Sequence, residues 1–153
     1  MDAAARIHGA PGFLGLLAPR VLSSSRDGAE LRLSSGPALH NHVGGPHAAV
    51  IFGLGETAAF AVLLEVFGDL VEAGAVPLVK QASIAYLGIA TGPLLAAAVP
   101  AGDEAGARGS YAQRGSASFP VEVVFRREAD GVETGRCTYV MAVRRAPASG
   151  AAL

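Results

Sequence analysis

The sequence predicts an α+β fold in which an antiparallel β-sheet wraps around one long, buried central helix. Residues 46–67 are apolar on nearly every side and carry Glu56 in their middle. A helix of this kind cannot lie on a surface, so other parts of the fold must surround it. A hairpin precedes the helix and about four strands follow it, without the alternation of strands and helices that a parallel sheet requires. The expected partner of the helix is therefore an antiparallel sheet.

The chain before the helix predicts an arm and a hairpin. Residues 1–20 are interrupted by Pro and Gly and are expected to form an arm or a short helix. Strand-like residues 21–25 and 30–34 flank Asp27-Gly28, a dipeptide typical of a hairpin turn.

The helix has recognisable ends. A polar loop finishes at Gly44-Gly45-Pro46, and proline suits the first turn of a helix. The helix is therefore expected to begin at residue 46 or 47 and to run through Phe67. Residues 68–74 are expected to be a frayed last turn or a second short helix.

The remaining residues predict four strands. Two runs of β-branched and small residues, 76–90 and 94–100, are separated by a Thr-Gly-Pro turn. The Gly-rich segment that follows is expected to be a loop or a short helix over residues 104–113. Residues 119–127 and 132–145 predict a long hairpin, and the tail over residues 146–153 is expected to be disordered.

Composition limits the functional classes. A chain of 153 residues is expected to be one domain, and 51% hydrophobic against 16% charged residues predicts a homodimer, with a tetramer as the alternative. The net charge of −1 gives no field that would attract nucleic acid. The single cysteine, Cys137, is expected in the core and fits a reducing cytoplasm. No membrane span is expected, because the apolar run falls short of about 20 residues and a central carboxylate opposes insertion.

The loop and helix together carry a family pattern. The order Asn, Gly, His, Gly, Gly, Asp of the hotdog-fold acyl-CoA thioesterases of the phenylacetate-degradation type is matched here by Asn41, Gly44, His47, Ala48, Ala49 and Glu56. The sequence resembles this family over residues 21–145. Two alanines replace the glycines and Glu56 replaces the aspartate, a version that is similar to a close, largely uncharacterised branch of the fold.

The resemblance implies a hotdog fold and hydrolysis of an acyl-CoA or acyl carrier protein thioester, without a metal and with coenzyme A only as part of the substrate. It implies that Glu56 is the general base or nucleophile, that the Ala48 amide is the oxyanion donor and that Asn41 positions the thioester or water. His47 either takes a direct catalytic role or caps the helix. The expected substrate-binding residues are Gly44, Ala49, Thr57, Lys80 and Ser83.

Helical spacing tests this arrangement. His47 and Glu56 are nine residues apart, which is about 900° of rotation and about 13.5 Å along a helix, so they cannot converge from one chain. A shared site needs Glu56 from a partner subunit, which agrees with the family's active sites at the dimer interface.

Other functions stay open. A hotdog dehydratase acting on 3-hydroxyacyl thioesters would use a loop histidine such as His42 together with Glu56. A non-catalytic acyl or lipid binding dimer would leave Glu56 as a structural carboxylate, hydrogen-bonded to a neighbouring backbone group or hydroxyl. Small residues at Gly53, Gly55 and Ala58 either make room for an acyl chain or let the helix approach the sheet.

Overall fold

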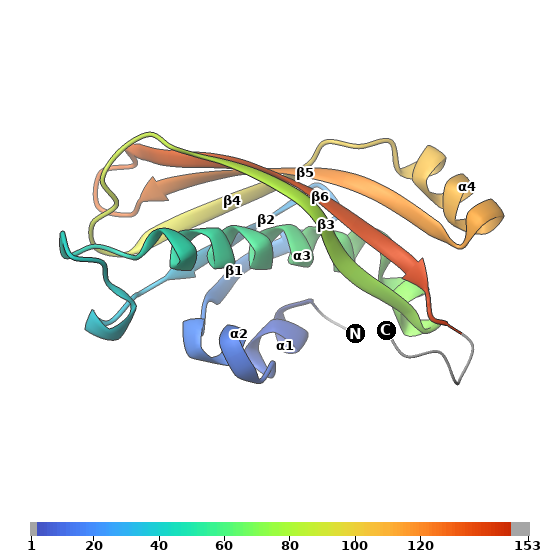
Figure 1. The fold of residues 1–153 in the computed structure, drawn as a ribbon, viewed down its shortest axis with the longest axis horizontal. Coiled ribbons are helices and arrows are strands. Elements are labelled where there is room, and N and C mark those ends of the chain that lie inside the picture. Colours follow the sequence, from blue (N-terminus) through green and yellow to red (C-terminus); the bar gives the residue numbers. More distant parts are fainter. Residues whose placement is uncertain (1–2, 148–153) are drawn as a thin grey trace.

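A six-stranded antiparallel sheet curves around one long helix (Figure 1). The structure is a computed structural model that describes residues 3–147. The strands lie in the order β1-β2-β4-β5-β6-β3, and every neighbouring pair is antiparallel. The elements are α1 (Ala3–His8), α2 (Gly12–Leu17), β1 (Arg20–Ser25), β2 (Gly28–Leu33), a 3-10 turn (Pro37–Leu39), α3 (Ala48–Glu72), β3 (Ala75–Tyr86), β4 (Leu94–Pro100), α4 (Glu104–Arg114), β5 (Ser116–Arg127) and β6 (Glu133–Arg145). The predicted fold class is confirmed.

The predicted elements are mostly present, with one difference in how they connect. The β1–β2 and β5–β6 hairpins are confirmed, and the helix alternative for the Gly-rich segment is confirmed by α4. The arm contains two short helices, α1 and α2. Strands β3 and β4 follow each other in the chain but are not neighbours, because β3 pairs only with β6 and forms one edge of the sheet. The predicted disorder of the tail falls largely on residues 148–153, which lie outside the described part.

The central helix α3 packs against the concave face of the sheet, while α1 and α2 lie on its other side (Figure 1). It begins after His47, which is its N-cap residue, close to the predicted start. At Phe67 the backbone leaves helical geometry, with φ −123° and ψ 20°. The predicted end therefore coincides with a kink, beyond which a second short helical segment continues to Glu72. The helix is long and apolar enough to cross a membrane, but 78% of its most apolar window is buried inside the fold, as in a core helix.

Small residues let α3 approach its neighbours. A Cβ atom on Gly55 would lie 2.5 Å from Phe125 Cζ and 2.7 Å from the Tyr139 hydroxyl. A Cβ atom on Gly53 would lie 2.7 Å from Phe13 Cε1, in the arm. Gly55 thus lets the helix approach the sheet, one of the two roles that the sequence left open, and Gly53 lets the helix approach α2.

One side of α3 is not covered. Ala48 and Glu56 are exposed, and Phe52 and Phe60 are only partly buried. These four residues recur every fourth position and so form a stripe along one side of the helix, which we call the open stripe. The fold of one chain therefore leaves Glu56 exposed. The sheet and arm cover the rest of the helix and leave this stripe to solvent or to another molecule.

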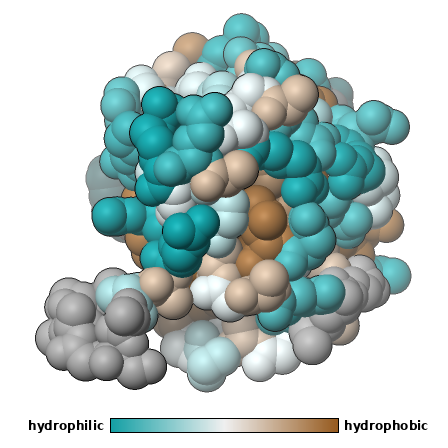
Figure 2. Space-filling model, turned by 90° about the vertical axis from the view of Figure 1, so that its right-hand side faces the viewer, coloured by the Kyte–Doolittle hydropathy of each residue, from teal (hydrophilic) through white to brown (hydrophobic). Residues whose placement is uncertain are grey.

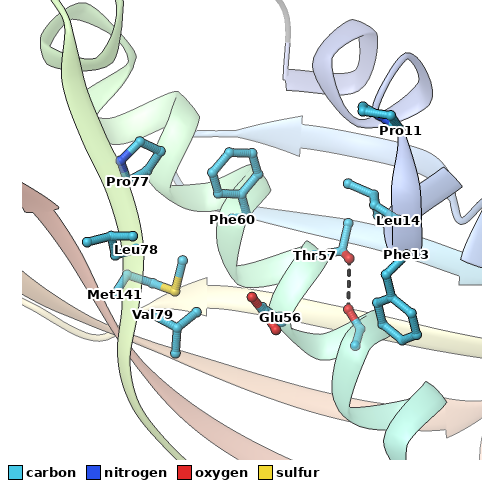
Figure 3. A pocket seen from close by; sticks show the side chains of 11 residues that line it. Pro11, Phe13, Leu14, Glu56, Thr57, Phe60, Pro77, Leu78, Val79 and Met141 are labelled. Atoms are coloured by element: carbon cyan, nitrogen blue, oxygen red, sulfur yellow. Dashed lines mark hydrogen bonds between the residues drawn. The ribbon is translucent and has the colours of Figure 1, made fainter. Parts of the chain in front are cut away.

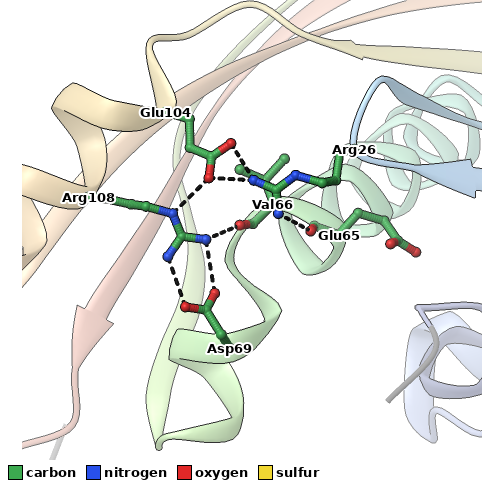
Figure 4. Close-up of polar contacts among 6 residues, drawn as sticks. All are labelled: Arg26, Glu65, Val66, Asp69, Glu104 and Arg108. Carbon is green, nitrogen blue, oxygen red and sulfur yellow. Dashed lines mark hydrogen bonds and ion pairs between the residues drawn. The ribbon is translucent and has the colours of Figure 1, made fainter.

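A network of ion pairs joins α4 to the kink (Figure 4). Arg108 Nη2 donates to Val66 O at 2.5 Å, its guanidinium binds both oxygens of Asp69, and it lies 5.2 Å from the centre of the Phe67 ring. Arg26 donates to Glu65 O and to Glu104. Helix kinks expose carbonyl groups that need other donors, so these guanidinium groups stabilise the break. The end of the molecule that carries α4 is largely hydrophilic around a small apolar patch (Figure 2).

Candidate active site

His47 holds the first turn of α3. The imidazole Nδ1 of His47 accepts a hydrogen bond from the Ala49 N–H at 3.1 Å, and the backbone N–H of His47 donates to Leu39 O at 2.9 Å. Because Nδ1 is an acceptor here, the proton of the neutral imidazole resides on Nε2. The capping role is present in the structure, and the Nε2–H group stays available to a ligand. A direct catalytic role for His47 stays a prediction.

The Ala48 amide is free at the positive end of the helix. Within residues 3–147 its N–H has no hydrogen-bond acceptor, whereas the Ala49 N–H is occupied by His47. The Tyr86 hydroxyl donates to Ala48 O at 3.0 Å, which fixes the orientation of this first peptide. Unpaired N–H groups at a helix start stabilise negative charge. Ala48 is therefore suited to hold an oxyanion.

Asn41 stabilises the loop before the helix. Its Oδ1 accepts from the N–H groups of Val43 at 3.0 Å and Gly45 at 3.3 Å, and its Nδ2 donates to Pro46 O at 3.4 Å. Gly44 supports the same turn with a φ of +81°, a conformation that favours glycine. Both ends of the Asn41 amide are thus used within the loop, and contact with a substrate stays a prediction.

Glu56 lies in an apolar groove between α2, α3 and β3 (Figure 3). The groove has a volume of about 390 Å³, and Glu56 is the one ionisable side chain among the described residues that line it. The other lining residues are Pro11, Phe13, Leu14, Gly53, Thr57, Phe60, Pro77, Leu78, Val79 and Met141. Such a groove suits an alkyl or aryl group with a carboxylate beside it.

The Glu56 carboxylate has no hydrogen bond or ion pair to any residue between 3 and 147. Thr57 follows it in the groove, but the Thr57 hydroxyl donates to Gly53 O at 2.7 Å, within the helix. The alternative of a structural carboxylate bonded to a neighbour therefore has no support within one chain. Glu56 is available for chemistry or for a partner.

Tyr139 lies beneath this part of the helix and was not singled out by the sequence. Its hydroxyl donates to Phe52 O at 2.6 Å, and its ring packs edge-on against Phe52. Burial raises the pKa of Tyr139 well above its ordinary value, with smaller contributions from Cys137 and Glu56. The side chain therefore stays neutral and acts as a fixed donor. Its inward position in an alternating strand was the only sequence signal.

The remaining candidates lie apart from the groove. Lys80 is on the outer face of the sheet, where its Nζ lies 3.5 Å from Ser118 Oγ, and Ser83 is exposed on β3. His42 is an exposed loop residue. Cys137 is buried, as expected, and burial raises its pKa. The structure thus brings neither Lys80 nor Ser83 to Glu56.

The two parts of the predicted site do not meet within one chain. Glu56 follows Ala48 by eight residues, which is about 12 Å along α3. Both residues belong to the open stripe, so they face the same uncovered side of the helix without touching each other.

Comparison with known proteins gives a family and a fold. A family model described as "Domain of unknown function (DUF4442)" matches residues 4–143. The chain belongs to this family. A search of curated proteins finds no match to this DUF4442 chain.

Solved structures resemble the DUF4442 chain over most of its length. The probable thioesterase PA5026 from Pseudomonas aeruginosa is 21% identical with a TM-score of 0.76, and 93% of each chain is covered. A protein of unknown function from Chlorobaculum tepidum is 13% identical with a TM-score of 0.77, over 94% of this chain and 93% of the other. A hypothetical thioesterase from Streptococcus pneumoniae, solved with coenzyme A, is 16% identical with a TM-score of 0.60, over 84% of this chain and 88% of the other. At these identities the likeness establishes the fold, which is the expected hotdog fold.

Proposed function

We propose that this DUF4442 protein hydrolyses the thioester of an acyl-CoA or acyl carrier protein, in the cytoplasm, to a free acid and a thiol. The observation that carries the proposal is the unpaired Glu56 carboxylate in an otherwise apolar groove. An apolar acyl group fits the groove, and the carboxylate stands beside it to activate water or attack the carbonyl carbon. The hypothetical thioesterase from Streptococcus pneumoniae, solved with coenzyme A, supports acyl-CoA as one of these two substrates.

A homodimer completes the proposed site, with a tetramer as the larger alternative. A second chain that crosses the open stripe in the opposite direction places its Ala48 amide near Glu56 of the first. The free edge of β3 supports this arrangement, because large apolar side chains stay exposed along it and in the loop that follows. These side chains are Leu78, Tyr86, Leu87 and Ile89.

The reaction then follows from the two parts. When Glu56 acts as the base, it takes a proton from water as the water oxygen bonds to the carbonyl carbon. The Ala48 N–H stabilises the oxyanion that forms. Collapse of this intermediate breaks the carbon–sulfur bond, and the proton held by Glu56 passes to the departing thiolate. When Glu56 acts as the nucleophile, its oxygen bonds to the carbonyl carbon and the carbon–sulfur bond breaks, which gives an anhydride and a thiolate. Water then hydrolyses the anhydride to the free acid and the Glu56 carboxylate, and the proton released from the water passes to the thiolate. The Ala48 N–H stabilises the oxyanion in both steps.

Two substitutions test the site without disturbing the fold. Glu56→Gln keeps the side-chain size and should lower hydrolysis of acyl-CoA at least about 100-fold, measured as free thiol. Ala48→Pro removes only the amide donor, because proline is tolerated at the first helical position. The extended backbone of His47, with φ −61° and ψ 147°, is also compatible with a following proline. Ala48→Ser retains the N–H and is the matched control.

Mixing the two inactive variants tests whether the site is shared. Random exchange of equal amounts makes about half of the dimers mixed, and each mixed dimer has one intact site of two, so activity should return to about a quarter of wild type. No recovery despite demonstrated subunit exchange would place the site within one chain. Loss of water from a 3-hydroxyacyl thioester would identify a dehydratase instead. Tight binding of an acyl thioester without turnover would identify an acyl-binding dimer.

A further inference from the structure

The outer face of the sheet carries a second groove, where β3, β5, β6 and the end of α4 meet. We call it the cationic groove, and the residues that define it are Lys80, Arg114, Arg144, Ser110, Ser116 and Ser118. Two cavities of about 490 and 340 Å³ adjoin there and share Lys80 and residues 116–118. Each cavity has a size that small ligands occupy, and the shared residues place the two side by side.

Strand β6 forms the floor of this groove. Ala142 pairs with Leu78 on one side and with Ser118 on the other, and its small side chain leaves space above the strand. Lys80 is the extra residue of a β-bulge in the β3–β6 pair. Bulges redirect a side chain, and Lys80 Nζ reaches across β6 to within 3.5 Å of Ser118 Oγ. The bulge thus brings the ammonium group over the groove.

The cations of the groove lack carboxylate partners. Within residues 3–147 neither Lys80, Arg114 nor Arg144 forms an ion pair, whereas Arg26, Arg32 and Arg108, for example, each bind a carboxylate. Arg114 instead donates to Ser110 Oγ at 2.6 Å, and this hydroxyl donates to Ser116 O at 2.8 Å, so the guanidinium is held at the rim with donors left over. Asp103 is the one carboxylate in the described lining. The three cations therefore leave an excess of positive charge.

We propose that the cationic groove binds phosphate groups, which the substrate supplies through the nucleotide portion of coenzyme A. Guanidinium, ammonium and hydroxyl donors are the groups that bind phosphate oxygens in proteins. Leu78 and Val79 line both this groove and the groove that holds Glu56, so the two sites flank the same edge strand. The phosphate preference follows from the cationic groove alone, and the choice of coenzyme A rests on the proposed function.

Calorimetric titration with three ligands tests the inference without any turnover. Coenzyme A, pantetheine, which lacks phosphate, and inorganic phosphate are each titrated into wild type and into the Lys80→Gln, Arg144→Gln double variant. The double variant should bind coenzyme A about ten-fold more weakly, because two charge-assisted contacts are lost, and should bind pantetheine unchanged. Added salt should weaken coenzyme A binding to wild type more than to the double variant. With an active enzyme, the loss should fall mainly on KM.

Arg126→Gln is the matched control, because Arg126 is also exposed on β5 but lies eight residues, about 26 Å, beyond Ser118. If the double variant also loses affinity for inorganic phosphate, the groove is a general phosphate site. If it loses affinity for coenzyme A alone, the groove recognises the nucleotide portion. Unchanged coenzyme A affinity in the double variant, an equal loss in Arg126→Gln or a loss of pantetheine binding would overturn the inference. So would capture of an acyl carrier protein by the groove in place of coenzyme A. Absence of hydrolysis in wild type would refute the proposed function and leave this binding result standing.

Discussion

Gly55 shows how one missing side chain sets the position of the central helix. Alanine there would gain about 1 kcal/mol in helix propensity but place a methyl group against Phe125 and the Tyr139 hydroxyl. Overpacking a core usually costs about 1–3 kcal/mol, and the bond from Tyr139 to Phe52 O is strained as well. After the propensity gain is subtracted, we expect Gly55→Ala to lower the free energy of unfolding by about 1 kcal/mol in urea titrations at fixed protein concentration.

Gly68 is the control for this prediction, because it lies in the same helix and a Cβ atom added there would meet nothing within 4 Å. Gly68→Ala should raise the free energy of unfolding by roughly 0.5–1 kcal/mol. If both substitutions raise the free energy of unfolding, helix propensity rather than packing governs these positions.

At the residue scale the sequence identified Glu56 but not the hydrogen-bond partners of Asn41 within its loop. A carboxylate inside an apolar run is visible in any single sequence. The partners of Asn41 are backbone groups of its own loop, which become close only through the turn at Gly44. Tyr139 was missed for a similar reason, because its bond to Phe52 O spans 87 positions of sequence.

Among the elements, α4 acts on α3 through a single arginine. Arg108→Ala removes the bond to Val66 O, the pair with Asp69 and the contact with the Phe67 ring. Because these groups are partly exposed to water, we expect a loss of about 1 kcal/mol in the free energy of unfolding. Arg136→Ala is the control, since Arg136 pairs with Glu133 on an exposed strand and should contribute almost nothing. Equal effects of the two substitutions would contradict a special role for the kink.

The same network should respond to acid. The hydrogen bonds from Arg108 lower the pKa of Asp69, and those from Arg108 and then Arg26 lower the pKa of Glu104. A carboxyl group with a lowered pKa in the folded state adds stability above its unfolded pKa and loses it as pH falls through the folded value. The difference in the free energy of unfolding between wild type and Arg108→Ala should thus be largest at neutral pH. It should shrink as the pH falls below the ordinary pKa values of 3.8 for Asp69 and 4.5 for Glu104, measured by urea titrations across that range. A difference that is constant down to low pH would assign the effect to packing alone.

The strand elements themselves were predictable and their order in the sheet was not. Alternation of apolar and polar residues marks β5 and β6, and a turn sequence marks their hairpin. Nothing local indicates that β3 crosses to the far side of β6 while β4 inserts between β2 and β5. Such pairings depend on contacts between distant segments, which local patterns do not encode.

For the whole molecule, the two sheet edges differ in a way that predicts the interface. β3 is 12 residues long with exposed apolar side chains along it and beyond, whereas β1 has 6 residues. We expect wild type to be a dimer at micromolar concentration in sedimentation equilibrium, and Leu87→Lys to shift it towards monomer while the fold is retained, because Leu87 is 57% exposed in one chain.

Leu22→Lys is the control, because Leu22 is 42% exposed on β1, at the opposite edge. It should leave the dimer intact. A wild-type protein that stays a folded monomer at these concentrations would contradict the dimer, and dissociation by Leu22→Lys alone would move the interface to the other edge.

The arm that walls the apolar groove also affects how this family can diversify. Phe13 and Leu14 form one side of the groove from α2, which packs on α3 at Gly53 but contributes no strand to the sheet. Substitutions in such a short segment can widen or narrow the groove while sheet pairing, helix cap and Glu56 stay as they are. If the groove holds the acyl group, as proposed, selection on Phe13 and Leu14 can alter the size of the accepted acyl group without altering the pairing of the strands.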